Sequence, residues 1–209
     1  MRDENPSIYF PKSSERKTIA RVLSRAFQQE PIYMQFIPDA EKRKRTLPRI
    51  FDIFVRYCFK YGEIYATSES FEGVIMCLPS ESWQISPWRM LRCGAWKLPF
   101  LLGFKFISRM TKIEEKCTYF HTKYASNPHT YIWHLGVEPE FQGKGCGGKL
   151  LRHLLKRLTE ERRTCYLETA EEKNVAFYRH FGFEVVDMVE FADLQLIIWA
   201  LLKSQINSE

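Results

Sequence analysis

A glycine-rich segment between a predicted strand and a predicted helix is the feature that most restricts how this chain folds. It reads Gln142-Gly143-Lys144-Gly145-Cys146-Gly147-Gly148-Lys149. The apolar run 130–137 predicts a strand before it, and residues 147–161 show helical spacing of apolar side chains after it. Glycines let a backbone turn its N–H groups toward a phosphate, and the N-terminus of a helix adds partial positive charge. The segment therefore predicts a loop that binds a pyrophosphate.

Two nucleotide-binding patterns match this loop but do not fit its surroundings. Residues 143–149 satisfy the Walker A spacing, yet Leu150 stands where that motif needs a hydroxyl for Mg²⁺. The glycines also satisfy G-x-G-x-x-G, and Glu168 falls at the end of the next predicted strand, where a ribose-binding acid is expected. However, residues 138–141 separate the loop from its strand, and too little chain follows Glu168 to complete a doubly wound sheet. A dinucleotide-dependent oxidoreductase remains a less favoured alternative.

A third pattern fits without such conflicts. Gln142-x-x-Gly145-x-Gly147 resembles the (Q/R)-x-x-G-x-(G/A) pyrophosphate loop of the GNAT superfamily of N-acetyltransferases. Residues 134–139 resemble that family's fourth strand and its exit, and residues 167–169 resemble its fifth strand. The run 174–183 resembles the following helix and is similar to bacterial antibiotic acetyltransferases of the puromycin type. The resemblance covers roughly residues 132–186.

The resemblance implies an α/β fold, in which a mixed, mainly antiparallel sheet of about six or seven strands is flanked by helices. It also implies a V-shaped splay between strands 4 and 5. We expect one GNAT-like acyltransferase domain over residues 1–209. Its parts are an N-terminal half at 1–129 with acceptor-side helices and an insertion at 83–124, an acetyl-CoA-binding core at 130–186, and a C-terminal hairpin at 183–202.

Periodicity, caps and turn residues predict the remaining elements. Residues 86–124 are rich in aromatic side chains and are expected to be helical, with breaks at Pro99 and Gly103. The other predicted helices cover about 13–27, 39–61 and 174–181, and the other predicted strands cover 7–10, 64–67, 73–78, 164–168, 183–190 and 194–201.

The resemblance further implies acetyl-CoA as cosubstrate and a set of residues that bind it. Free backbone groups of the fourth strand would bond the pantetheine arm, and one of its N–H groups would stabilise an oxyanion. Lys144 or Lys149 would add charge near the phosphates, and Asn174 would either bond the pantetheine or cap its helix. The expected cofactor-binding residues are Leu135, Gly136, Val137, Gln142, Gly143, Lys144, Gly145, Cys146, Gly147, Gly148, Lys149 and Asn174.

Two residues are the expected catalytic groups. Tyr178 matches the family's tyrosine in the helix after the fifth strand, and a protonated phenol can donate to a departing thiolate. Glu168 is the candidate general base, with His134 as an alternative of suitable ordinary pKa. No histidine or acid is placed by a motif to activate Cys146 or Cys165, so direct attack through a tetrahedral intermediate is favoured over an acyl-enzyme.

Composition narrows the partners. The formal charge of +6 suits an anionic cofactor such as CoA, and the densest basic run, residues 42–45, is interpreted as a solvated helix face. Without concentrated charge or a long apolar span, we expect neither nucleic acid nor membrane as a partner. Six scattered cysteines without CxxC spacing predict no metal site. The charged N-terminus is not typical of a signal peptide, which predicts a cytoplasmic protein.

The sequence thus predicts an acetyl-CoA-dependent N-acetyltransferase acting on a primary amine of a small molecule. The aromatic insertion at 83–124 would contribute to the acceptor pocket, to the core or to a homodimer contact. A non-catalytic module that binds CoA as a sensor or for protein interaction is the alternative from another class.

Overall fold

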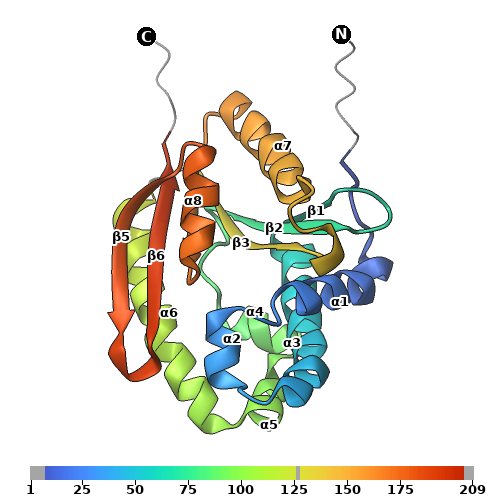
Figure 1. Ribbon diagram of the computed structural model, residues 1–209, viewed down its shortest axis with the longest axis vertical. Helices are drawn as coiled ribbons and strands as arrows, with labels where there is room; N and C mark the ends of the chain where they lie inside the picture. The colour runs from blue at the N-terminus through green and yellow to red at the C-terminus, as the bar shows by residue number, and fades with distance from the viewer. Residues whose placement is uncertain (1–7, 126–127, 205–209) are drawn as a thin grey trace.

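Six strands form one sheet in the part of the chain that the computed structural model describes, residues 8–125 and 128–204 (Figure 1). The order is β1-β2-β3-β4-β6-β5, and every neighbouring pair is antiparallel except the parallel pair β3–β4. The predicted mixed, mainly antiparallel sheet with flanking helices is therefore confirmed. The strands are β1 (Glu63–Ala66), β2 (Gly73–Pro79), β3 (His129–Val137), β4 (Thr164–Thr169), β5 (Glu184–Phe191) and β6 (Leu196–Lys203).

The strand predicted at 7–10 is reduced to a single bridge between Tyr9 and Ala66, and Ser7 lies outside the described residues. The two predicted C-terminal strands do form a hairpin. The second strand of the hairpin, β6, lies between β4 and β5. The hairpin therefore joins the rest of the sheet through β6, and β5 is an edge strand.

Helices cover both faces of the sheet. On one face, α1 and α3 pack against β1–β3 and α6 packs against β4–β6, while α7 and α8 cover the other face. Figure 1 shows α8 in front of the β5–β6 hairpin and α6 behind it. In the described part, no helix is both long and apolar enough to cross a bilayer. The helices are α1 (Arg16–Ala26), α2 (Pro31–Phe36), α3 (Ala40–Tyr61), α4 (Pro87–Arg92), α5 (Leu98–Leu102), α6 (Phe104–Tyr124), α7 (Cys146–Glu160) and α8 (Glu172–His180), with 3-10 turns at Ser13–Glu15, Ala95–Lys97, Pro139–Phe141 and Ala192–Leu194.

Helix α3 begins where the sequence predicts, because the side chain of Asp39 accepts a hydrogen bond from the Lys42 N–H. One residue of its first turns differs from expectation. Arg43 is only 4% exposed and donates to the carbonyl oxygens of Gln28 and Ile37. The interpretation of residues 42–45 as a solvated face is wrong at Arg43, which satisfies otherwise unpaired carbonyls of the chain around α2.

The insertion at 83–124 is helical, as predicted, but only one of its two expected breaks is correct. Gly103 separates α5 from α6 with a φ of +83°, a left-handed conformation that favours glycine. Pro99 does not break a helix, because it lies in the first turn of α5, where a missing N–H costs nothing. The chain turns instead at Gly94, whose φ is +100°.

Candidate active site

The site lies where β3 and β4 separate. These strands pair only from His129 to Tyr131 on β3 and from Thr164 to Tyr166 on β4. Both continue without pairing to each other, β3 as far as Val137 and β4 as far as Thr169. The splay that the resemblance implies is therefore present. The strands that the family pattern numbers four and five correspond to β3 and β4 here.

A β-bulge marks the start of the splay. Met76 pairs with His134 and Cys77 with Ile132, so Trp133 is an extra residue on β3 relative to β2. A bulge increases local twist and re-aims the strand that carries it. Leu135, Gly136 and Val137 follow the bulge, paired with β2 on one side and free of β4 on the other. Their free edge is therefore accessible to an extended ligand.

The glycine-rich loop closes one end of this opening. The side chain of Gln142 donates to the carbonyl oxygen of Val137 at 3.2 Å, which fixes the loop to the end of β3. Gly143 and Gly145 have φ values of +75° and +83°, and no atom of the described residues lies within 4 Å of a Cβ built on either. Side chains at these two positions would be strained and would occupy the open space that a phosphate needs.

The N-terminus of α7 presents several unused donors to this space. Within the described residues, the N–H groups of Gly145, Cys146, Gly147 and Gly148 make no hydrogen bond, whereas that of Lys149 bonds the carbonyl of Gly145. Unpaired N–H groups at a helix N-terminus, together with the helix dipole, favour an anion. The donor set therefore fits a pyrophosphate group.

The two lysines of the loop differ. Lys149 turns away from the loop and donates from Nζ to the carbonyl oxygen of Thr67 at 2.6 Å, which ties α7 to the β1–β2 connection. Its predicted contact with phosphate stays a prediction and would require Nζ to leave the Thr67 carbonyl oxygen. Lys144 is exposed, with Nζ 5.1 Å from the centre of the Phe141 ring, and has no carboxylate partner in the described residues. Lys144 remains the predicted phosphate cation.

Gly136 has a packing role that the sequence did not reveal. A Cβ at this position would lie 2.8 Å from Leu23 Cδ2 and 3.1 Å from Ala26 Cβ, both on α1. The glycine therefore lets α1 approach the back of β3 directly behind the splay.

Tyr178 lies on the sheet face covered by α7 and α8. Its side chain is 7% exposed, and its ring contacts those of Phe177 and Phe183. Burial raises its pKa, and the nearby thiols of Cys165 and Cys77 raise it further. The last paired residue of β4 is Tyr166, and Cys165 comes one residue before it. Because the Cys165 thiol lies near Tyr178, Tyr178 lies beside the point where the two strands separate. In the described residues its hydroxyl makes no hydrogen bond.

Glu168 lies on the opposite face, toward α6. Alternation along β4 places Leu167 in the α7–α8 core and Glu168 beside Tyr131. Burial raises the pKa of Glu168 to about 8, although the phenols of Tyr131 and Tyr166 lower it. By hydrogen-bond geometry, neither Oε2 of Glu168 nor the Tyr166 hydroxyl has a partner in the described part of the chain, although both are buried.

Glu114 is a carboxylate near Glu168 that was not predicted from the sequence, and Glu30 and Glu171 are a second pair of neighbouring carboxylates. The charge of Glu114 on α6 raises the pKa of Glu168. Burial raises the pKa of Glu30, at the N-terminus of α2, to about 7, and the charge of Glu171 adds to this. Burial raises the pKa of Tyr33, and the charges of Glu30 and Glu114 raise it further. We call the four side chains of Glu30, Glu114, Glu168 and Glu171 the glutamate cluster. Among the described residues, no lysine or arginine contributes to the pKa shifts of Glu30, Glu114 or Glu168, whereas Glu171 forms an ion pair with Lys173 at 3.0 Å.

The remaining candidates are less suited to catalysis. His134 packs among the rings of Phe27, Phe51 and Phe54, and burial lowers its pKa to about 3, so the imidazole is a weak base. Cys165 is buried and its thiol pKa is raised by burial, which disfavours the nucleophilic thiolate.

Asn174 does not cap α8, because the helix begins at Glu172 with Glu171 as its N-cap. Its side-chain amide instead donates to Thr169 and Glu171, both at 3.3 Å. It therefore lies at the open end of β4, and its predicted contact with the pantetheine remains a prediction.

Comparison with known proteins agrees with this geometry. Residues 109–183 match the model of the acetyltransferase (GNAT) family. The chain is 23% identical over 178 residues to the uncharacterized N-acetyltransferase C550.08 of Schizosaccharomyces pombe, covering 82% of this chain and 72% of the relative.

Solved structures of other proteins share the fold, and two of them illustrate the likeness. One is a Corynebacterium glutamicum protein described as histone acetyltransferase HPA2 and related acetyltransferase, with a TM-score of 0.69, 18% identity, and coverage of 96% of this chain and 97% of the other. The other is arylalkylamine N-acetyltransferase 2 of Aedes aegypti, with a TM-score of 0.63, 12% identity, and coverage of 95% and 98%.

Proposed function

We propose that this chain is an N-acetyltransferase of the GNAT superfamily that depends on acetyl-CoA and acts on a primary amine of a small molecule. The observation that carries the proposal is the set of unpaired N–H groups at the start of α7, which faces the open edge of β3. A diphosphate at the loop and an extended arm along β3 together match the shape of coenzyme A.

The fit assigns the cosubstrate to particular groups of the chain. Amides from Gly145 to Gly148 would hold the pyrophosphate, with Lys144 beside it. The unpaired edge at Leu135–Val137 would bond the pantetheine amides, and one of its N–H groups would point to the carbonyl oxygen. Acetyl-CoA supplies a thioester whose carbonyl carbon accepts a nucleophile.

The glutamate cluster supports the proposal that the acceptor is a cation. Glu30 and Glu168 have pKa values raised to about 7 and about 8 because they are desolvated among like charges. A cation bound beside Glu168 and Glu114, or beside Glu30 and Glu171, would relieve this repulsion. In a chain of net charge +6, a buried Glu168 that has no cationic partner among the described residues, on the part of β4 that β3 leaves unpaired, favours an ammonium ligand over a neutral or anionic one.

The raised pKa also suits Glu168 to accept the proton. An alkylammonium has a pKa of about 10, so transfer to a carboxylate of pKa about 8 is uphill by about 2 pKa units, against about 6 for an ordinary glutamate. The neutral amine then attacks the carbonyl carbon directly. The C–N bond forms first and gives a tetrahedral intermediate. When it collapses, the C–S bond breaks, Tyr178 donates its proton to the sulfur, and the second proton lost by the amine nitrogen restores the Tyr178 hydroxyl. The products are an amide and free CoA, and protonated Glu168 releases its proton to solvent.

Release of the CoA thiol from acetyl-CoA, measured over a panel of amines, tests this proposal. The panel contains spermidine, agmatine, tryptamine, puromycin and a peptide with a free N-terminus. We expect turnover with at least one amine, and loss of turnover in Gly145→Asp. Binding of acetyl-CoA without turnover on a broad panel would favour the non-catalytic CoA module. A rise in melting temperature with NAD(H) but not with acetyl-CoA would favour the oxidoreductase.

A further inference from the structure

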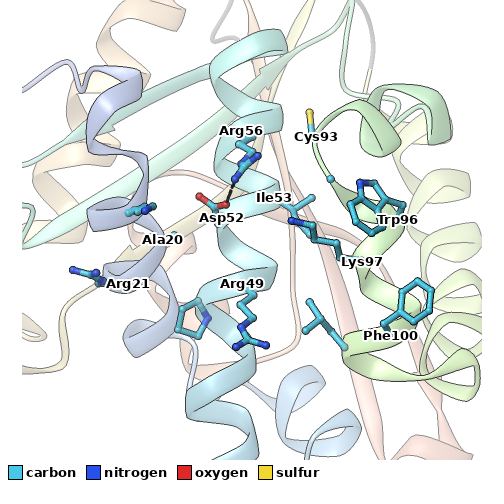
Figure 2. A pocket seen from close by; sticks show the side chains of 14 residues that line it. Ala20, Arg21, Arg49, Asp52, Ile53, Arg56, Cys93, Trp96, Lys97 and Phe100 are labelled. Atoms are coloured by element: carbon cyan, nitrogen blue, oxygen red, sulfur yellow. Dashed lines mark hydrogen bonds and ion pairs between the residues drawn. The ribbon is translucent and has the colours of Figure 1, made fainter.

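A second concave site lies away from the splay. A cavity of about 610 Å³ is lined by α1, α3 and the chain from Cys93 to Leu101 (Figure 2). On α1 its lining residues are Lys17, Ala20 and Arg21, whereas Leu23 and Ala26 of the same helix pack against Gly136 of β3. The cavity and the splay are therefore on different sides of α1.

The cavity is strongly basic, and Asp52, its one lining carboxylate among the residues that the structure describes, is already neutralised. Asp52 accepts hydrogen bonds from Arg16 on one oxygen and from Arg56 on the other. Four other cations line the cavity, and none has a carboxylate partner among the described residues; they are Lys17, Arg21, Arg49 and Lys97. Figure 2 shows Lys97 extending toward α3, while Arg21 extends outward at the edge of α1.

The cavity also has an apolar part that is open to solvent. Ile53 is buried at its α3 side, whereas Trp96 and Phe100 at its rim are 57% and 85% exposed. Figure 2 shows both rings projecting from the segment that faces α3. Nζ of Lys97 lies 5.2 Å from the centre of the Trp96 ring, so a cation without a carboxylate partner in the described part of the chain lies directly beside the exposed apolar surface.

We infer that this cavity binds an amphipathic organic anion. Its phosphate or carboxylate head lies between Arg49 and Lys97, and its apolar body lies against Ile53, Trp96 and Phe100. Arginine and lysine form charge-assisted hydrogen bonds to such heads. The volume falls in the range of about 300–1,000 Å³ that small-molecule sites occupy. This site is separate from the one that holds acetyl-CoA.

Calorimetric titration with octyl phosphate, as a soluble probe below its micelle concentration, tests the inference. We expect the wild-type chain to bind octyl phosphate at least about tenfold more tightly than inorganic phosphate or octanol, because only the probe uses both parts of the cavity. Arg49→Gln/Lys97→Gln keeps the side-chain stems and should weaken binding at least about tenfold. The matched control Lys156→Gln removes an exposed charge from α7 and should leave the affinity unchanged.

Three results would overturn the site. One is no binding of octyl phosphate by folded wild-type protein. Another is equal binding by Arg49→Gln/Lys97→Gln with an unchanged melting temperature. The third is binding to phosphatidylcholine vesicles containing phosphatidic acid but not to monomeric probe, which would assign the exposed rings to a membrane surface. Gly145→Asp should retain probe binding, so that failure of the acetyl-CoA site and failure of this site are distinguishable.

Discussion

Glu168 and Tyr178 lie on opposite faces of the sheet at the opening between β3 and β4. Glu168 lies beside Tyr131 and is influenced by Glu114 of α6, whereas Tyr178 lies in the core under α7 and α8. A thioester in the opening would therefore meet a proton acceptor on one side and a proton donor on the other. In our proposal the acceptor amine enters from the α6 face, and the thiol leaves toward the α8 face.

Tyr178→Phe should slow acetyl transfer by about 10²-fold or more, since it removes the donor to the departing sulfur. Acetyl-CoA affinity should change little, because the ring keeps its contacts with Phe177 and Phe183. Single-turnover kinetics and calorimetry measure these two effects separately. Wild-type rates in Tyr178→Phe would remove the residue from the acid role.

Glu168→Gln should lower kcat/KM by about 10²-fold or more and change its pH dependence. The base must be ionised, so the wild-type kcat/KM should rise with pH up to the Glu168 pKa of about 8. This limb should disappear in Glu168→Gln, leaving only the ionisation of the acceptor amine. Retention of the limb in Glu168→Gln would mean that another group is the base.

The same carboxyl should make stability depend on pH. The pKa of Glu168 is about 8 in the folded chain, whereas that of an ordinary glutamate is 4.5, so the folded state retains a proton that the unfolded chain releases. Its contribution to the free energy of unfolding therefore falls as pH rises from about 4.5 to about 8. The melting temperature of Glu168→Gln minus that of the wild type should be larger at pH 9 than at pH 5. Glu160→Gln, an exposed control on α7, should give the same difference at both pH values.

Gly136→Ala and Gly147→Ala form a matched pair for stability. The first places a methyl group 2.8 Å from Leu23 Cδ2 and should cost about 1–3 kcal/mol. The second places it 3.5 Å from Phe177, an ordinary contact, inside α7, and should be neutral or slightly stabilising. Urea unfolding measures both. Equal midpoints would contradict the close approach of α1 to β3.

Local signals in the sequence were enough for much of the fold. Helical spacing of apolar residues predicted α1, α3 and α7, and the glycine motif predicted the unpaired donors before α7. Short α2 was missed because Pro31–Phe36 has too few residues to establish a period. The order of β6 and β5 in the sheet could not be predicted either, since a hairpin pattern does not say which strand joins the sheet.

Side-chain partners depended on tertiary contacts and were harder to predict. Lys149 belongs to the loop in sequence, but the β1–β2 connection offers its ammonium a carbonyl. His134 has an ordinary pKa in isolation, and only the ring cluster around it makes it a weak base. The glutamate cluster contains Glu30 and Glu114, which come from segments far apart in the chain, and no local spacing in the sequence predicts it.

Calorimetric titration of acetyl-CoA into wild type, Gly145→Ala and Gly145→Asp tests the central claim most directly. The φ of +83° at Gly145 costs any other residue about 1–2 kcal/mol of backbone strain, and only aspartate also places a negative charge beside the pyrophosphate. We predict one site in the wild type and at least about tenfold weaker binding by Gly145→Asp than by Gly145→Ala. Absence of heat with folded wild-type protein at two temperatures, or equal affinity of the two variants, would contradict the account.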